Sequence, residues 1–208
     1  MPIAGAFFVL RRIYNRIMDI KWRDNNGFTL MEAMVVLAII TMLSAVTLIS
    51  FTGVNDAITL RKERFQVALA IREAQNMALA VKLIAGGITA PAYGVRFSTV
   101  AGSSSTYFIF ADSNNNRVYD SGETKIGGDS ITGDRTMEKG IKVSVLTPQS
   151  GSPPPVAYIT FASPEAEARM ADGSGTPLGE WLEITLANRS GTLTARIRIR
   201  TSGQVTLR

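Results

Sequence analysis

FTLMEAMVVLAIITMLSAVTLISF, residues 28–51, is the longest apolar run in the chain, and it contains a single charged residue, Glu32. At a rise of 1.5 Å per residue the run makes a helix about 36 Å long, which exceeds the roughly 30 Å thickness of a bilayer core. Lipid offers no hydrogen-bond partner to unpaired backbone groups, so a single segment crosses it only as a helix. The run therefore predicts a membrane-spanning helix.

The charges that precede this run predict its orientation. The net charge of the chain is +5, and residues 1–27 contribute +3 of it, from Arg11, Arg12, Arg16, Lys21 and Arg23 against Asp19 and Asp24. The positive-inside rule then places the N-terminus in the cytoplasm and the residues after about 51 outside. The alternative is a secretory signal peptide, whose apolar region would be shorter and would end at small residues such as Ala45 or Ser50.

The composition narrows the chemistry that this chain of 208 residues can perform. It contains no cysteine, which excludes disulfides and thiolate catalysis, and no histidine, which removes the commonest general base and metal ligand. Nucleotide-binding loops and the common hydrolase motifs are absent from the sequence. A Ser-Lys arrangement stays open, but no residue pattern points to one. The sequence therefore predicts a protein that is not an enzyme.

The remainder of the chain predicts an α+β fold. In residues 54–85 apolar side chains recur at helical spacing among charged ones, namely Ile58, Phe65, Leu69, Met77 and Val81. We expect this amphipathic segment, within 53–87, to continue the membrane helix of 28–52 over a soluble core, and to stop at Gly86-Gly87. Residues 88–208 form the predicted extracytoplasmic β domain, an antiparallel sheet packed on the helix. Its predicted strands are 93–98, 106–111, 141–146, 157–161, 181–186, 193–200 and 205–207.

Two segments of the β domain carry candidate binding residues. Oxygen-bearing side chains occupy positions 1, 3, 5, 9 and 12 of the loop DSNNNRVYDSGE: Asp112, Asn114, Asn116, Asp120 and Glu123. With the backbone carbonyl of Val118 at position 7, this is the spacing of an EF-hand-type Ca²⁺ loop. Arg117 replaces the usual Gly at position 6, and the loop follows a strand. The alternative is a solvated turn closed by its own Asn and Asp side chains.

The other segment is the basic C-terminal strand. In 193–200 Leu193, Ala195, Ile197 and Ile199 alternate with polar residues, and the candidate nucleic-acid contacts on and after this strand are Arg196, Arg198, Arg200 and Arg208. Arginines on one strand face could neutralise several phosphates. A solvent-facing row that discourages edge pairing is the commoner meaning of such a pattern, so nucleic acid is not an expected partner.

NNGFTLMEAMVVLAII, residues 25–40, resembles the leader junction of type IV prepilins: a basic leader, then Gly27, Phe28, Thr29, Leu30 and Glu32, then an apolar run. The resemblance implies a leader peptide of residues 1–27, cleavage by a prepilin peptidase between Gly27 and Phe28, and N-methylation of Phe28. It also implies that Glu32 pairs with the methylated amine of a neighbouring subunit during filament assembly. The leader is long for the family, and Met18 is an alternative start to Met1.

The downstream residues suggest a branch of this family. PAYGVRF at 91–97, VAYITF at 156–161 and the ending RIRIRTSGQVTLR at 196–208 resemble H-type minor pseudopilins of type II secretion and FimT-like minor pilins. The expected partners are other pilin or pseudopilin subunits and an inner-membrane assembly platform. The expected location is the inner membrane, with the β domain outside the cytoplasm, and then the filament. The alternatives are a DNA-binding minor pilin and an uncleaved membrane-anchored binding domain.

Overall fold

The computed structural model describes residues 27–83, 87, 89–165 and 167–208, with the backbone alone for 48–53. The chain divides into two units between Ile49 and Ser50. Residues 1–26 of the predicted leader, both candidate starts and Gly86 lie outside the described residues. The domain boundaries inferred from the sequence stay predictions.

Helix α2 (Leu30–Leu79) is continuous across the boundary between the two units. It begins two residues later than the apolar run, because Thr29 caps it: the Thr29 carbonyl accepts the first helical bond from Ala33 N (3.1 Å), and Thr29 Oγ1 accepts a bond from Glu32 N (3.2 Å). A threonine followed three residues later by a glutamate is a known helix-start signal. The capping therefore follows directly from the local sequence.

The C-terminal end of α2 corrects the prediction that the helix stops at Gly86-Gly87. Lys82 N donates to the Met77 carbonyl (3.1 Å) and Val81 N to the Ala78 carbonyl (3.2 Å), with Val81 in the left-handed region at φ 46°. This bonding pattern is a Schellman motif, which usually places glycine where Val81 stands. The Ser163 hydroxyl also donates to the Ala78 carbonyl (2.8 Å), so the β domain helps to end the helix.

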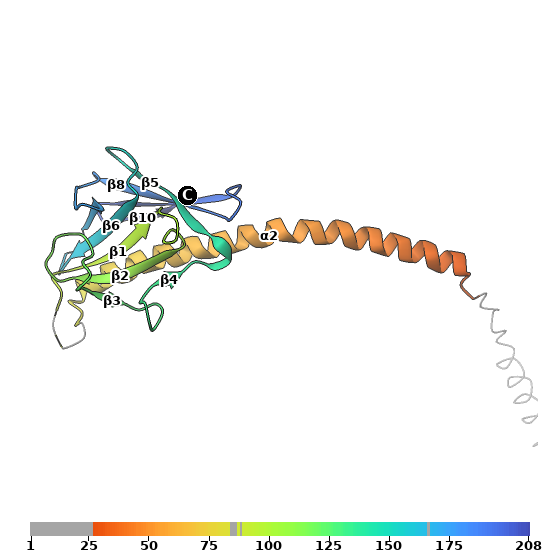
Figure 1. The fold of residues 1–208 in the computed structure, drawn as a ribbon, viewed down its shortest axis with the longest axis horizontal. Coiled ribbons are helices and arrows are strands. Elements are labelled where there is room, and N and C mark those ends of the chain that lie inside the picture. Colours follow the sequence, from red (N-terminus) through yellow and green to blue (C-terminus); the bar gives the residue numbers. More distant parts are fainter. Residues whose placement is uncertain (1–26, 84–86, 88, 166) are drawn as a thin grey trace, which may run out of the picture. The chain divides into compact units, whose positions relative to one another are not determined.

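Ten strands follow α2 in the described part of the chain, and every pairing between them is antiparallel. Figure 1 draws them as arrows. The six-stranded sheet has the order β3 (Thr124–Ile126), β2 (Thr106–Asp112), β1 (Ala92–Ser98), β6 (Val156–Ala162), β7 (Ala168–Asp172), with β4 (Arg135–Thr136) also paired to β2. The four-stranded sheet has the order β10 (Val205–Leu207), β9 (Thr194–Arg200), β8 (Trp181–Ala187), β5 (Lys142–Pro148). A short 3-10 helix, η1 (Glu138–Gly140), precedes β5.

This architecture confirms the predicted α+β class and refines it. All seven predicted strands are present, with ends that differ by at most two residues. The strands divide between two sheets instead of forming one, and β3, β4 and β7 were not predicted.

The core lies between the soluble half of α2 and the two sheets. From α2 it takes Leu60, Val67, Ala70, Ile71, Ala74, Met77 and Ala78. The predicted apolar face of this helix is therefore wrong for all its members except Met77, which is 6% exposed. Ile58, Phe65 and Leu69 lie on the solvent side, and Val81 is exposed beyond the helix end. Small alanines form much of the buried face, since they let strands approach the helix closely.

The outer face of the six-stranded sheet carries a second apolar cluster. Phe108, Phe110 and Tyr158 form it, and Val118 and Tyr119 of the loop after β2 pack against it. The ring of Tyr119 meets those of Phe108 and Phe110 edge to face, with centroids 4.8 and 5.6 Å apart. This packing holds the predicted Ca²⁺ loop against the sheet.

Candidate functional site

The predicted cleavage junction lies immediately before α2. Gly27 and Phe28 are exposed and non-helical, and 79% of Phe28 is accessible to solvent. No atom outside its neighbours lies within 4 Å of a Cβ built on Gly27. Proteolytic cleavage is favoured in exposed chain segments outside regular structure. The junction is exposed and lies outside regular structure.

Glu32 is exposed in the first turn of α2. A carboxylate at this end of a helix is favoured by the helix dipole. Among the described residues, Glu32 forms no ion pair.

The helix that follows Glu32 is apolar on all sides. Leu30–Thr47 has a mean hydropathy of 2.1 and is long enough to cross a membrane, and none of it is buried within the chain. A soluble core helix of this composition would be buried, so the exposure of this one suits a helix that anchors the chain in a membrane.

Residues 22–48 match the family model of the prokaryotic N-terminal methylation motif. This match supports a type IV pilin-like protein. It covers 27 of the 208 residues and contains Gly27, Phe28 and Glu32. Pilin-type subunits are generally structural and not catalytic. No significant match was found among curated proteins or among solved structures.

The loop after β2 is closed by its own hydrogen bonds. Asp112 is fully buried, and its carboxylate accepts bonds from Asn116 N (3.2 Å) and Arg117 N (2.9 Å). The Glu123 carboxylate accepts bonds from Ser113 N (2.7 Å) and Asp120 N (3.1 Å). Burial raises the pKa of Asp112 and of Glu123, and these N–H donors partly offset the effect.

The ligand set inferred from the sequence is partly assembled in this loop. The side-chain amides of Asn114 and Asn116 both donate to Asp120 Oδ2 (2.8 Å each), which gathers these three side chains. Arg117 has φ 71°, the left-handed conformation that glycine usually supplies at position 6. Within the described ranges no three Asp or Glu side chains form a metal-like cluster, so amide and carbonyl oxygens would have to complete the shell. Calcium binding stays a prediction.

We expect full-length protein to take up one Ca²⁺ in a calorimetric titration, with a Kd of about 10⁻⁴ to 10⁻³ M, the range of extracellular modules. Asp120→Asn and Glu123→Gln, at positions 9 and 12, are expected to remove the heat, whereas Asp129→Asn, an exposed acid outside the loop, is expected to keep it. Because the pKa of Glu123 is raised, uptake should weaken as the pH falls. No heat at millimolar Ca²⁺ would contradict the prediction.

The arginines of β9 are less available than their sequence spacing predicts. The Glu183 side chain is buried in the register position opposite Arg198 and binds its guanidinium at 2.9 Å. Arg198 also lies over the ring of Trp181, 4.3 Å from its centroid. Arg196 is exposed and 3.6 Å from Glu183, while Arg200 and Arg208 are exposed. Cross-strand partners of this kind depend on the register, which the residue pattern does not provide.

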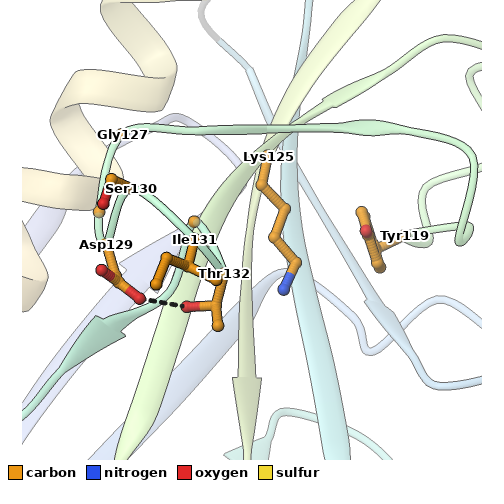
Figure 2. A pocket seen from close by; sticks show the side chains of 9 residues that line it. Tyr119, Lys125, Gly127, Asp129, Ser130, Ile131 and Thr132 are labelled. Atoms are coloured by element: carbon orange, nitrogen blue, oxygen red, sulfur yellow. Dashed lines mark hydrogen bonds between the residues drawn. The ribbon is translucent and has the colours of Figure 1, made fainter.

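A hollow of about 540 Å³ lies between Tyr119 and the glycine-rich loop 127–133 (Figure 2). Its polar groups bond mainly to one another: the Thr132 hydroxyl donates to Asp129 (3.2 Å), and Lys125 pairs with Asp134 (2.7 Å). Lys125 Nζ also lies 4.2 Å from the centroid of the Phe108 ring. These contacts close the loop 127–133 and neutralise Lys125 of β3.

Proposed function

We propose that the chain is a structural subunit of a bacterial filament, a minor pseudopilin of a type II secretion pseudopilus or a minor pilin. A prepilin peptidase would cleave it between Gly27 and Phe28 and methylate Phe28. One observation carries the proposal: an exposed, non-helical Gly27-Phe28 junction directly precedes an unburied apolar helix with Glu32 in its first turn. Before assembly the helix would anchor the subunit in the inner membrane, with the β domain outside the cytoplasm.

Glu32 would set the register of assembly. A charged side chain in the hydrocarbon region costs roughly 2.5–3.5 kcal/mol on insertion scales, so a partner for it is strongly favoured. The methylated amine of Phe28 on a neighbouring subunit would supply the opposite charge. The apolar helix would then exchange lipid for the helices of other subunits.

Mass spectrometry of protein co-expressed with a prepilin peptidase tests the proposal. We expect a peptidase-dependent product that begins at N-methylated Phe28. Gly27→Ala should abolish this product, since the peptidase recognises the glycine of the motif, while Gly122→Ala, at another exposed glycine with open space around it, should not. An uncut chain, or cleavage between Ala45 and Ser50, would refute the pilin assignment.

DNA binding is the second candidate function, and exposed Arg196 and Arg200 on the solvent side of β9 favour it. Because Glu183 neutralises Arg198, we expect full-length protein not to retard duplex DNA in a gel-shift at low salt. Retardation that is lost in Arg196→Ala/Arg200→Ala and kept in Lys139→Ala/Lys142→Ala would instead favour a DNA-binding minor pilin.

A further inference from the structure

A line of exposed side chains follows the solvent side of α2 between residues 54 and 72. Its apolar members are 56 to 60% exposed, and two arginines lie between and after them. We call this line the arginine seam; it consists of Val54, Ile58, Arg61, Phe65, Leu69 and Arg72. The steps between successive members are 4, 3, 4, 4 and 3 residues. That spacing keeps side chains on one face and is the spacing of packed helices.

The arginine seam carries only positive charge. Arg61 and Arg72 form no ion pair with another described residue. The acids on this part of α2 interact with other residues. Asp56 accepts a hydrogen bond from Asn188 (3.3 Å), and Glu73 forms an ion pair with Arg135 (2.9 Å). Glu63 is buried and accepts a bond from Glu138 N (3.2 Å). None of these three acids forms an ion pair with Arg61 or Arg72.

A concave surface adjoins the C-terminal half of the seam. Leu69 and Met77 line a hollow of about 470 Å³, together with the basic residues Arg72 and Lys82. The one acid that lines it, Glu73, already forms an ion pair with Arg135. A hollow of this kind can receive a side chain from a partner, with a nearby acidic group opposite the two cations. The shape and the charge of this region therefore favour the same kind of partner.

A second copy of the chain does not fit this surface. In either direction and at any register, an arginine of one seam would meet only an apolar side chain or another arginine of the second seam, because the seam contains no acid. The arginine would then lose water without gaining an ion pair. Both arrangements are costly, because a desolvated charge needs an opposite charge.

We propose that the arginine seam docks a helix of a different protein, whose apolar face carries acidic side chains opposite Arg61 and Arg72. The inference rests on the proposed function in one respect, since it assigns this partner to the other subunits of the filament. It makes the chain a subunit that joins a heterologous neighbour through this face. Such a subunit does not polymerise with itself there.

The experiment uses full-length protein in nanodiscs of zwitterionic lipid. The probe is a fluorescein-labelled synthetic helix of four heptads, with leucine at the core positions and glutamate beside them. We expect the acidic helix to raise the anisotropy on binding. Arg61→Glu/Arg72→Glu should weaken it by about tenfold or more, because two attractive pairs become repulsive. The same variant should gain binding to a helix with lysine in place of glutamate.

Lys139→Glu/Lys142→Glu is the matched control, since both lysines are exposed off the seam and the charge change is the same. It should bind the acidic helix as the unchanged protein does. Equal loss in this control would mean non-specific charge attraction and would overturn the proposal. All variants alter exposed side chains, so unchanged Trp181 fluorescence in urea verifies their folding.

The sequence contains no cysteine, so the substitution Ile58→Cys places a single thiol on the seam. Cross-linking or labelling of this thiol tests whether a second copy of the chain or a membrane surface covers the seam. A dimer cross-linked through this position, without the acidic helix, would establish a second copy as the occupant and overturn the proposal. A dye on this cysteine that becomes buried in anionic nanodiscs alone would indicate a membrane surface and also overturn it. The cleavage assay is independent: cleavage without helix binding refutes only this inference, and helix binding without cleavage refutes only the pilin assignment.

Discussion

Ile71→Ala is expected to lower the free energy of unfolding by about 2–5 kcal/mol, the usual cost of truncating a buried aliphatic side chain to alanine. Ile71 is fully buried in the core cluster that joins α2 to both sheets. The substitution removes three carbon atoms' worth of contact there and leaves a cavity that a helix packed on two sheets cannot easily collapse. Urea unfolding of the full-length protein with Trp22→Phe, so that Trp181 in β8 is the one remaining tryptophan, measures the change by fluorescence.

Leu69→Ala provides the matched control, two residues away on the same helix. Leu69 is 59% exposed, so its truncation should change the free energy of unfolding by no more than about 0.5 kcal/mol. Similar losses in the two variants would mean that both side chains are buried. A larger loss for Leu69→Ala would mean that the buried face of α2 is the one that the sequence pattern predicted.

Gly94→Ala is expected to destabilise the β domain by about 1–3 kcal/mol, the range for overpacking a close-packed interior. Gly94 lies in the central strand β1, opposite Phe110 of β2 and Thr160 of β6. A Cβ at this position would lie 2.7 Å from the Phe110 ring and 2.7 Å from the Thr160 methyl group. The ring cannot easily move aside, because Tyr119 and Tyr158 meet it edge to face. The same urea titration measures the loss.

The Phe110→Leu background identifies the cause of this loss. If the added methyl group clashes with the ring, Gly94→Ala should cost less in Phe110→Leu than in the unchanged protein, and the difference measures the coupling between the two sites. Equal costs in both backgrounds would assign the effect to the strand backbone or to Thr160. An unchanged unfolding midpoint for Gly94→Ala alone would contradict the close packing itself.

The residue pattern predicted most of the secondary structure because the signals concerned are local. Strands such as β9 alternate strictly, and Ala195, Ile197 and Ile199 are buried as that alternation requires. The strands that it missed are short or paired at edges. β3 and β4 contain three and two residues, so their pairing with β2 depends on a neighbour and not on their own composition.

The apolar face of the soluble helix was mispredicted for a physical reason. Large apolar side chains at helical spacing usually mark the core face, but here the buried face combines Ile71 and Val67 with alanines such as Ala70 and Ala74. Alanines permit close approach of the strands and have little weight in a pattern of hydrophobic residues. The larger Ile58, Phe65 and Leu69 remain on the solvent side, which suits an interface between subunits.

The sequence by itself determined the candidate processing site and the anchor, because each depends on adjacent residues: Gly27-Phe28 before an apolar run, Thr29 three residues ahead of Glu32, and enough apolar length to cross a bilayer. Only the tertiary structure decided which face of α2 is buried, that Glu183 neutralises Arg198, and that the oxygens of the loop after β2 are already bonded to its own N–H groups. These features depend on contacts between residues far apart in the chain. Their energies are set by strand register and by packing against the helix, which no local pattern of residues contains.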